Sequence, residues 1–318
     1  MPVPWSIAWS RSATGPGGFW RRETPVAHFT TSTGTVLARA MVRLLGEVDA
    51  RLGFPAAVDV MDVGAGEGRL LEEMRALLDG TDLGSRARLT GIDVRQRPSD
   101  LPEDIAWGVA DATRDGLPTA RGLVMAHEWL DEVPLDIVER DTQGADRIVL
   151  VDDDGRESLG APPGADAAAW MAAWWPLQAI GERAEVGLSR DAAWARLCAM
   201  VEAGTLLATD YGHVATERRP TLRGYRSGNI VDPTPDGSCN ITAHVAMDAC
   251  AAATPLDMAV TMDTQAAALA ALGLSGGLPD PSVLTPAEYA RKLSVAWEAQ
   301  ALRDPAGRGS FTWLRADR

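Results

Sequence analysis

The sequence of 318 residues lacks the features that would assign it to a membrane or to an oxidising compartment. It contains no run of about 18 consecutive apolar residues, so we expect no transmembrane helix. Its first residues lack the basic start and apolar centre of a signal peptide. The cysteines, Cys198, Cys239 and Cys250, are odd in number and form no C-x-x-C pair, which argues against a disulfide framework or a zinc site. We therefore expect a cytoplasmic protein without a membrane partner.

Positive charge is also scarce, and Lys292 is the only lysine. With 30 basic and 44 acidic residues, the formal net charge is −14. Nucleic-acid binding through a basic face requires clustered cations, so we expect no nucleic-acid partner. The negative charge would attract a cationic peptide, although solubility alone explains it equally well. His28 and His127 have no partner at metal-ligand spacing, and we predict no metal site.

The central motif of the chain, residues 58–71, lacks one glycine that a dinucleotide-binding turn requires. Residues 58–63 predict a buried strand, and the apolar spacing from Leu70 onward predicts a helix. Between them, Gly64, Gly66 and Gly68 have the spacing G-x-G-x-G, whereas a dinucleotide site needs a third glycine where Arg69 stands. The observed spacing is typical of class I S-adenosylmethionine (SAM) methyltransferases. An NAD-dependent oxidoreductase and a tight turn without a ligand remain the alternatives.

Two further strand candidates end in acidic residues. The first, residues 88–93, ends at Asp93, where a carboxylate can accept hydrogen bonds from both ribose hydroxyls of a nucleoside. The second, residues 105–111, ends at Asp111, where class I methyltransferases often hold the adenine amino group. Acidic strand ends in register with a glycine turn favour SAM as the cofactor.

Strand and helix patterns alternate along most of the chain, which predicts an α/β fold with a doubly wound, mostly parallel, seven-stranded sheet. Residues 1–33 show no periodicity and are predicted to be a loop-rich lead segment that could act as a lid. Residues 34–318 are predicted to form the methyltransferase domain. A substrate-side insertion is expected at about residues 211–257, irregular up to residue 240 and helical over 241–253.

The ordered set of motifs resembles the MidA-type methyltransferases, which include a mitochondrial complex I assembly factor. The resemblance runs from about residue 18 to the C-terminus, and the blocks that carry it are residues 29–32, 62–68, 128–134, 209–212 and 237–245. It implies a class I fold, SAM as cofactor, and transfer of a methyl group to a protein arginine. It also implies cofactor contacts from Asp62, Ala65 and His127, in addition to the turn glycines and the acidic strand ends.

The chain departs from the pattern of that family at several positions. His127 stands where asparagine is usual, Asn240 where aspartate is usual, and Ser32 and Thr33 replace part of the lead-segment motif. The SAM turn is unaffected by these changes. They leave open a non-catalytic SAM-binding assembly factor and a small-molecule methyltransferase as alternatives to an arginine methyltransferase.

Glu128 and Asp131 are the candidate catalytic residues. Methylation of a guanidinium requires carboxylates that bind its planar fork and localise its charge away from the attacking nitrogen. The two acids are three residues apart after a predicted strand at the cofactor edge. A helix cap or a cofactor contact is the alternative role of Glu128, and a structural carboxylate that of Asp131. Tyr211 and His244 could contact the substrate, or they could be buried supporting residues.

Overall fold

The computed structural model describes residues 1–22, 34–274 and 277–318. Its largest sheet has seven strands in the order β16-β17-β10-β5-β2-β3-β4. Strands β10, β5, β2, β3 and β4 are parallel, and at one edge β17 pairs antiparallel with both β10 and β16. This confirms the predicted mostly parallel sheet. The strands are β2 (Val58–Val63), β3 (Ala87–Asp93), β4 (Ala106–Val109), β5 (Ala120–His127), β10 (Val201–Asp210), β16 (Ala259–Thr264) and β17 (Thr312–Asp317).

Helices cover both faces of this sheet, and alternate strand residues supply the two cores. In β5, Leu123 and Met125 join the core on one face, while Val124 and Ala126 join the core on the other. The first face is covered by α4 (Thr35–Arg51), α5 (Arg69–Leu78), α10 (Gln265–Ala271) and α11 (Pro286–Arg303). The second face is covered by α8 (Leu188–Met200) and α9 (Met247–Ala252). This is the two-sided covering expected of a doubly wound fold.

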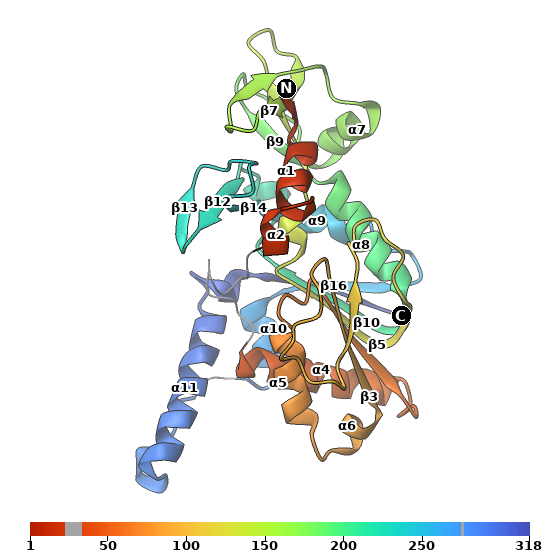
Figure 1. Cartoon of the computed structure of the whole chain (residues 1–318), viewed down its shortest axis with the longest axis vertical. Coiled ribbons are helices and arrows are strands. Elements are labelled where there is room, and N and C mark those ends of the chain that lie inside the picture. The colour runs from red at the N-terminus through yellow and green to blue at the C-terminus, as the bar shows by residue number, and fades with distance from the viewer. Residues whose placement is uncertain (23–33, 275–276) are drawn as a thin grey trace.

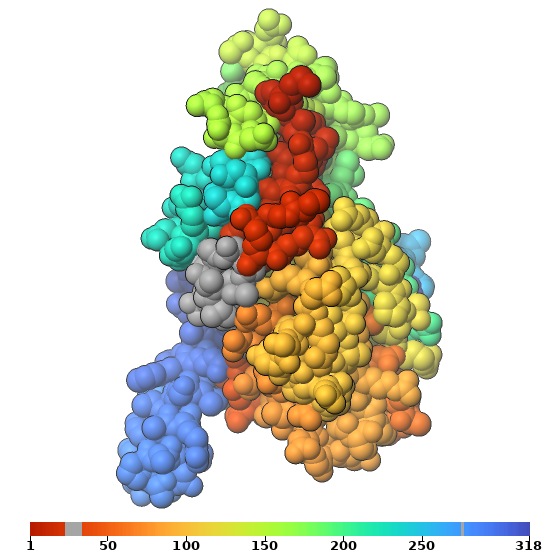
Figure 2. Space-filling view, in the orientation of Figure 1, coloured from red at the N-terminus to blue at the C-terminus, as the bar shows by residue number. Residues whose placement is uncertain are grey.

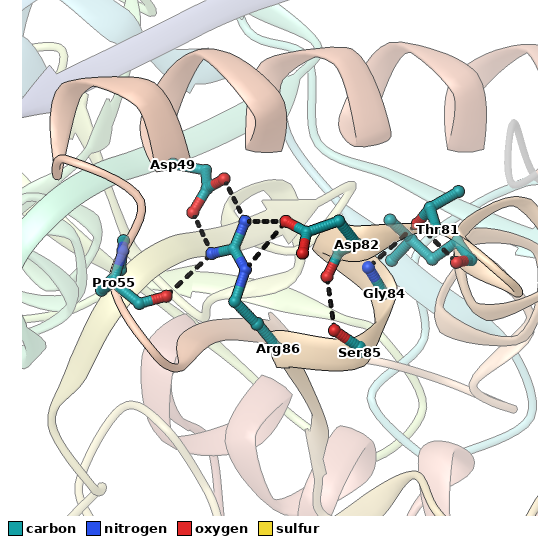
Figure 3. A network of polar contacts seen from close by, with 8 residues as sticks. Asp49, Pro55, Thr81, Asp82, Gly84, Ser85 and Arg86 are labelled. Atoms are coloured by element: carbon teal, nitrogen blue, oxygen red, sulfur yellow. Dashed lines mark hydrogen bonds and ion pairs between the residues drawn. The ribbon is translucent and has the colours of Figure 1, made fainter.

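A half-buried arginine, Arg86, fixes helix α4 to the strand beside it (Figure 3). The guanidinium of Arg86, at the end of α6 (Asp82–Arg86), donates to both carboxylate oxygens of Asp49 at 2.7 and 2.8 Å. It also donates to the carbonyl of Pro55 and to Asp82. The ion pair holds the pKa of Asp49 below its usual range. Because β3 begins at the next residue, this network fixes α4 against the end of the sheet remote from the carboxyl ends of its strands.

A second, smaller sheet lies at one end of the molecule (Figure 1). Its strands run in the order β1-β7-β6-β9, with β8 paired to β7, and α7 (Ala165–Trp174) packs against it. Strands β6 and β7 pair as an antiparallel hairpin whose turn contains residues 142–144. The strands are β1 (Val3–Pro4), β6 (Asp136–Arg140), β7 (Asp146–Val151), β8 (Glu157–Leu159) and β9 (Arg183–Val186).

The insertion, residues 211–257, is more regular than predicted. The expected irregular stretch to residue 240 contains three paired strands, and the expected helix over 241–253 shortens to α9, because residues 240–242 and 245–246 form strands. These strands have two to four residues each, too few to show a periodicity. They form a three-stranded sheet and a separate parallel pair: β12 (Arg223–Arg226), β13 (Asn229–Val231), β14 (Asn240–Thr242), β11 (Gly212–His213) and β15 (Val245–Ala246).

The lead segment is helical where loop was predicted. Helices α1 (Trp5–Thr14) and α2 (Phe19–Arg22) occupy most of its described part. Trp5, Trp9 and Ala13 are buried against the second sheet and β14, a spacing of four that fits one helix face. Prolines and glycines flank this short apolar stripe, and for that reason the sequence pattern predicted a loop there. The division of the chain at residue 33 stays a prediction, and His28 and the block 29–32 lie outside the described residues.

Candidate active site

A crevice opens at the carboxyl ends of β2, β3 and β5, where the strand order reverses and open α/β sheets bind ligands. Its wall combines four parts of the chain: the glycine turn, the segment after β3, the segment after β4, and the segment after β5. The lead segment closes one side. Figure 2 shows that segment in red, lying between the insertion and the body of the main sheet. The predicted site residues that line the crevice are Gly64, Ala65, Gly66, Asp93, Asp111, His127 and Glu128.

The glycine turn requires glycine for conformation and for space. Gly64, Gly66 and Gly68 have φ values of 73°, 61° and 75°, in the left-handed region that other residues rarely adopt. A Cβ on Gly64 would lie 2.5 Å from Cδ1 of Trp129, and one on Gly68 would lie 2.7 Å from Cδ1 of Leu101. Gly68 is also the residue before helix α5, although it does not itself line the crevice. The turn therefore presents main chain, not side chains, to a ligand.

Asp93 joins this turn to the end of β3. Its Oδ2 accepts a hydrogen bond from the N–H of Gly66 at 2.8 Å, and its Oδ1 accepts one from the N–H of Arg95 at 3.0 Å. Burial raises its pKa, although the Arg95 guanidinium opposes the shift. Because each carboxylate oxygen can accept a second bond, Asp93 can brace the turn and still bind ribose hydroxyls.

Asp111 and Asp62, the other two acidic residues predicted to contact the cofactor, lie in different environments. Asp111 lines the crevice, and its Oδ1 accepts bonds from both the N–H and the hydroxyl of Thr113 at 3.0 and 2.6 Å, which closes a tight turn there. Asp62, at the end of β2, is 4% exposed and does not line the crevice. Burial, with a smaller contribution from Asp93, raises its pKa to about 7. Asp62 therefore lies behind the turn.

Glu128 lies at the crevice in an uncommon backbone conformation. Its φ is 50°, a left-handed value that costs a non-glycine residue about 1 kcal/mol or more. Its N–H donates to the carbonyl of Thr209 at 2.8 Å, which fixes the bend as the chain leaves β5. Its Oε1 lies 3.2 Å from Nε2 of His127, and both side chains line the crevice. Strained residues of this kind cluster at functional sites.

Asp131 has a different place from the one predicted. Its carboxylate accepts the hydroxyl of Thr242 at 2.7 Å, and its Oδ1 is buried without a hydrogen-bond partner among the described residues. Burial raises its pKa to about 6. It is absent from the crevice wall, although the charge of Glu128 acts on its carboxylate. The arrangement agrees with the structural alternative for Asp131.

The segment after β5 is held by buried side chains from distant parts of the chain. The N–H groups of Trp129, Leu130 and Asp131 donate to one carboxylate oxygen of Asp210 at 3.1, 2.8 and 3.2 Å. Arg190, 1% exposed on α8, donates only to main-chain oxygens, which belong to Asp131, Val133, Ala243 and His244. These bonds join the short helix η1 (Leu130–Glu132) to β10, to α8 and to the insertion.

Glu132 is a crevice residue that the sequence reasoning did not select. Its Oε1 accepts a hydrogen bond from Nδ2 of Asn240 at 3.1 Å. Burial and the neighbouring Asp131 raise its pKa well above its usual range. The sequence did contain a signal for Glu132, because this residue lies four positions after Glu128 and within the block 128–134. Ser10, Ala13, Thr14 and Trp20 of the lead segment also line the crevice and were not selected.

Tyr211 and His244 are brought together, but outside the crevice wall. Their rings stack with centroids 5.6 Å apart, and the Tyr211 ring also contacts Phe311 at 4.1 Å. Burial raises the pKa of Tyr211, with the charges of Glu128 and Asp131 adding to it, so these carboxylates lie near the ring. Burial lowers the pKa of His244 to about 4, which keeps its imidazole neutral.

The residues of the crevice fit SAM. The turn at Gly64 has no room for a Cβ beside the Trp129 ring, and Asp93 offers acceptors for a ribose in the same crevice. Within the described part of the chain, no group of three or more histidine, cysteine or acidic side chains is placed to hold a metal ion. Over the same residues, none of the helices is long and apolar enough to cross a bilayer.

Solved structures of other proteins share the fold of this chain. Two crystal structures of Burkholderia thailandensis proteins, one of them bound to S-adenosyl-homocysteine, superimpose with TM-scores of 0.79 and 0.81. Each is 22% identical to this chain and matches all of it, and the chain covers 88% and 87% of the two proteins. No curated protein matches the sequence.

The family model that matches spans residues 36–263, more than two thirds of the chain, and its description is "putative S-adenosyl-L-methionine-dependent methyltransferase". The match confirms the family resemblance drawn from the motifs and the prediction of SAM as the cofactor. The chain belongs to this family of SAM-dependent methyltransferases.

Proposed function

We propose that the methyl acceptor is the guanidinium group of an arginine in a protein or peptide. The observation that carries the proposal is Glu128, a carboxylate fixed by a strained backbone in the wall of the cofactor crevice. A guanidinium has a pKa above about 12, so its nitrogens are poor nucleophiles until a carboxylate draws the positive charge to one side. The net charge of −14 supports a cationic substrate.

The reaction transfers one methyl group. When bound, SAM supplies a methyl carbon made electrophilic by the sulfonium. A guanidine nitrogen forms the new N–C bond as the S–C bond breaks, the sulfur keeps that electron pair as a neutral thioether, and the methylated nitrogen loses one proton to solvent. In this step Glu128 binds the N–H groups on the far side of the fork and holds the reacting nitrogen in line with the methyl.

We also propose that the lead segment acts as a lid and that the protein works in the cytoplasm. Ser10, Ala13 and Thr14 line the crevice from α1, and the guanidinium of Arg22 reaches the carbonyl of Gly237 in the insertion at 2.9 Å, which supports a covering role. The cysteines are all unbridged, which supports a reducing compartment.

Incubation with labelled SAM tests the acceptor. We expect label on arginine-containing peptides, none on matched peptides with lysine in place of arginine, and methylarginine by mass spectrometry of labelled host proteins. Glu128→Gln should lower turnover about a hundredfold or more while S-adenosylhomocysteine affinity changes less than about threefold. Glu202→Gln, at an exposed position at the opposite end of the sheet, is the control.

Three results would contradict the proposal. Label on a small metabolite alone would favour the small-molecule alternative. Normal cofactor affinity without transfer to any acceptor would favour a non-catalytic SAM-binding factor. A loss of S-adenosylhomocysteine affinity in Glu128→Gln would make this residue a cofactor ligand.

A further inference from the structure

Two carboxyl side chains four residues apart line the same crevice, Glu128 and Glu132. Asp131, between them in sequence, has its carboxylate on Thr242 and is absent from the crevice wall. We propose that Glu132, positioned by Asn240, is the second carboxylate that binds the acceptor guanidinium. The inference rests on the proposed arginine acceptor and replaces the sequence-based pairing of Glu128 with Asp131.

Asn240 leaves one oxygen of Glu132 available for a ligand. Its amide nitrogen can only donate, and it donates to Oε1 of Glu132 at 3.1 Å. Asn240 is 4% exposed on β14, so the side chain of Glu132 is held from a buried position. Oε2 of Glu132 has no hydrogen-bond partner among the residues that the structure describes, and the side chain lines the crevice. A carboxyl held at one oxygen can therefore offer the other to an N–H donor in the crevice.

The groups whose charges act on Glu132 are acidic, so a cation bound in the crevice would stabilise its carboxylate. The two arginines that line the crevice already have acidic partners: Arg69 is 3.0 Å from Glu67, and Arg95 is 3.4 Å from Asp93. The hydrogen bonds that the Arg190 guanidinium donates among the described residues go to main-chain oxygens. The groups that act electrostatically on Glu132 are acids from three elements, namely Asp131, Asp210 and Asp93. A buried carboxylate in such surroundings is stabilised by a bound cation.

A guanidinium satisfies two carboxylates better than an ammonium does. It presents five N–H donors in one plane, so two carboxylates can each take part of the fork and leave one nitrogen for reaction. The rival occupant is the ammonium of the amino-acid part of the cofactor, which is also a cation. If Glu132 binds the acceptor, removal of its charge would weaken binding of the guanidinium. If it binds the cofactor ammonium, removal of its charge would weaken binding of the cofactor.

Two cofactor analogues separate these cases. In both, the transferable methyl is replaced by a propyl chain, ending in a guanidinium in one and in the isosteric neutral urea in the other. We expect the wild-type protein to bind the guanidinium analogue at least about tenfold more tightly, by calorimetry. Glu132→Gln should reduce that preference to about twofold or less, and Asn240→Ala should reduce it part of the way. The control Glu202→Gln should leave it unchanged.

Each other outcome overturns a different statement. If the wild-type protein shows no preference for guanidinium, the arginine acceptor fails. If the preference exists and Glu132→Gln retains it, only the role of Glu132 fails. If Glu132→Gln weakens both analogues equally, Glu132 binds the cofactor ammonium. Affinity for S-adenosylhomocysteine and the thermal midpoint confirm that each variant is folded, and Glu132→Asp, which keeps the charge, should restore part of the preference.

Discussion

The two walls of the crevice differ in composition, because main chain forms one and side chains form the other. The cofactor wall is main chain and short-range turns: three glycines with left-handed φ, and an aspartate that accepts the N–H of the turn. The wall proposed for the acceptor carries Glu128 and Glu132, and we call it the acceptor wall. Buried side chains hold it from behind: Asp210 accepts the N–H of Leu130 in η1, and Asn240 donates to Glu132. A wall formed by main chain can bind the same cofactor in every member of a family. A wall formed by side chains can differ between members, because substitutions there change which substrate binds.

The largest expected effect is on the stability of the acceptor wall. Asp210→Ala removes the acceptor of three N–H groups in the buried segment 129–131, and we expect it to lower the free energy of unfolding by about 3 kcal/mol. Asp210→Asn, which keeps an oxygen at that place, should cost about 1 kcal/mol. Urea denaturation measures both. If the alanine variant is as stable as the asparagine variant, the wall does not depend on these bonds.

The second prediction concerns the cofactor wall. Gly64→Ala places a Cβ 2.5 Å from the Trp129 ring at a φ of 73°, and we expect S-adenosylhomocysteine affinity to fall about a hundredfold. Gly144→Ala is the matched control, because Gly144 has a φ of 79° and open space around it. It should lose about 1 kcal/mol of stability and no affinity. Equal affinities in the two variants would show that the turn does not contact the cofactor.

The smallest expected effect is a pH dependence confined to the acceptor wall. Burial, then the charges of Asp131, Asp210 and Asp93, raises the pKa of Glu132, so its carboxyl stays protonated at a pH where an exposed glutamate is ionised. A bound guanidinium favours the carboxylate and lowers this pKa. The preference for the guanidinium analogue over the urea analogue should therefore rise, by about threefold to tenfold, as the pH increases above about 4.3, where an exposed glutamate ionises.

Calorimetry at several pH values measures this dependence, with Glu132→Gln as the comparison. The glutamine variant should show a flat ratio, since it has no proton to release. A flat ratio in the wild-type protein, or the same slope in both proteins, would contradict the assignment.

The cofactor wall could be predicted from sequence because its parts are local. The alternating glycines define the turn, and Asp93 follows directly from a recognisable strand. The crevice contains both, as predicted. The sequence also identified Glu128, since it follows a buried strand that had to end at the ligand edge of the sheet.

The acceptor wall could not be predicted because its geometry depends on contacts across more than 50 residues. Asp131 and Glu132 are adjacent in sequence, and only their partners Thr242 and Asn240 decide which of them lines the crevice. Those partners lie on a three-residue strand, where the sequence predicted irregular structure up to residue 240 and a helix from residue 241. The helix α1 was missed for a related reason, since its buried stripe packs on strands that come more than 100 residues later.

The hydrogen bond between Glu132 and Asn240, which are 108 residues apart, also bears on how the protein is made on the ribosome. The segments of the main domain that form the cofactor wall have all been translated once residue 113 is added, whereas the anchor of Glu132 is translated only at residue 240. A nascent chain therefore contains the residues of its glycine turn well before it contains the residue that positions Glu132.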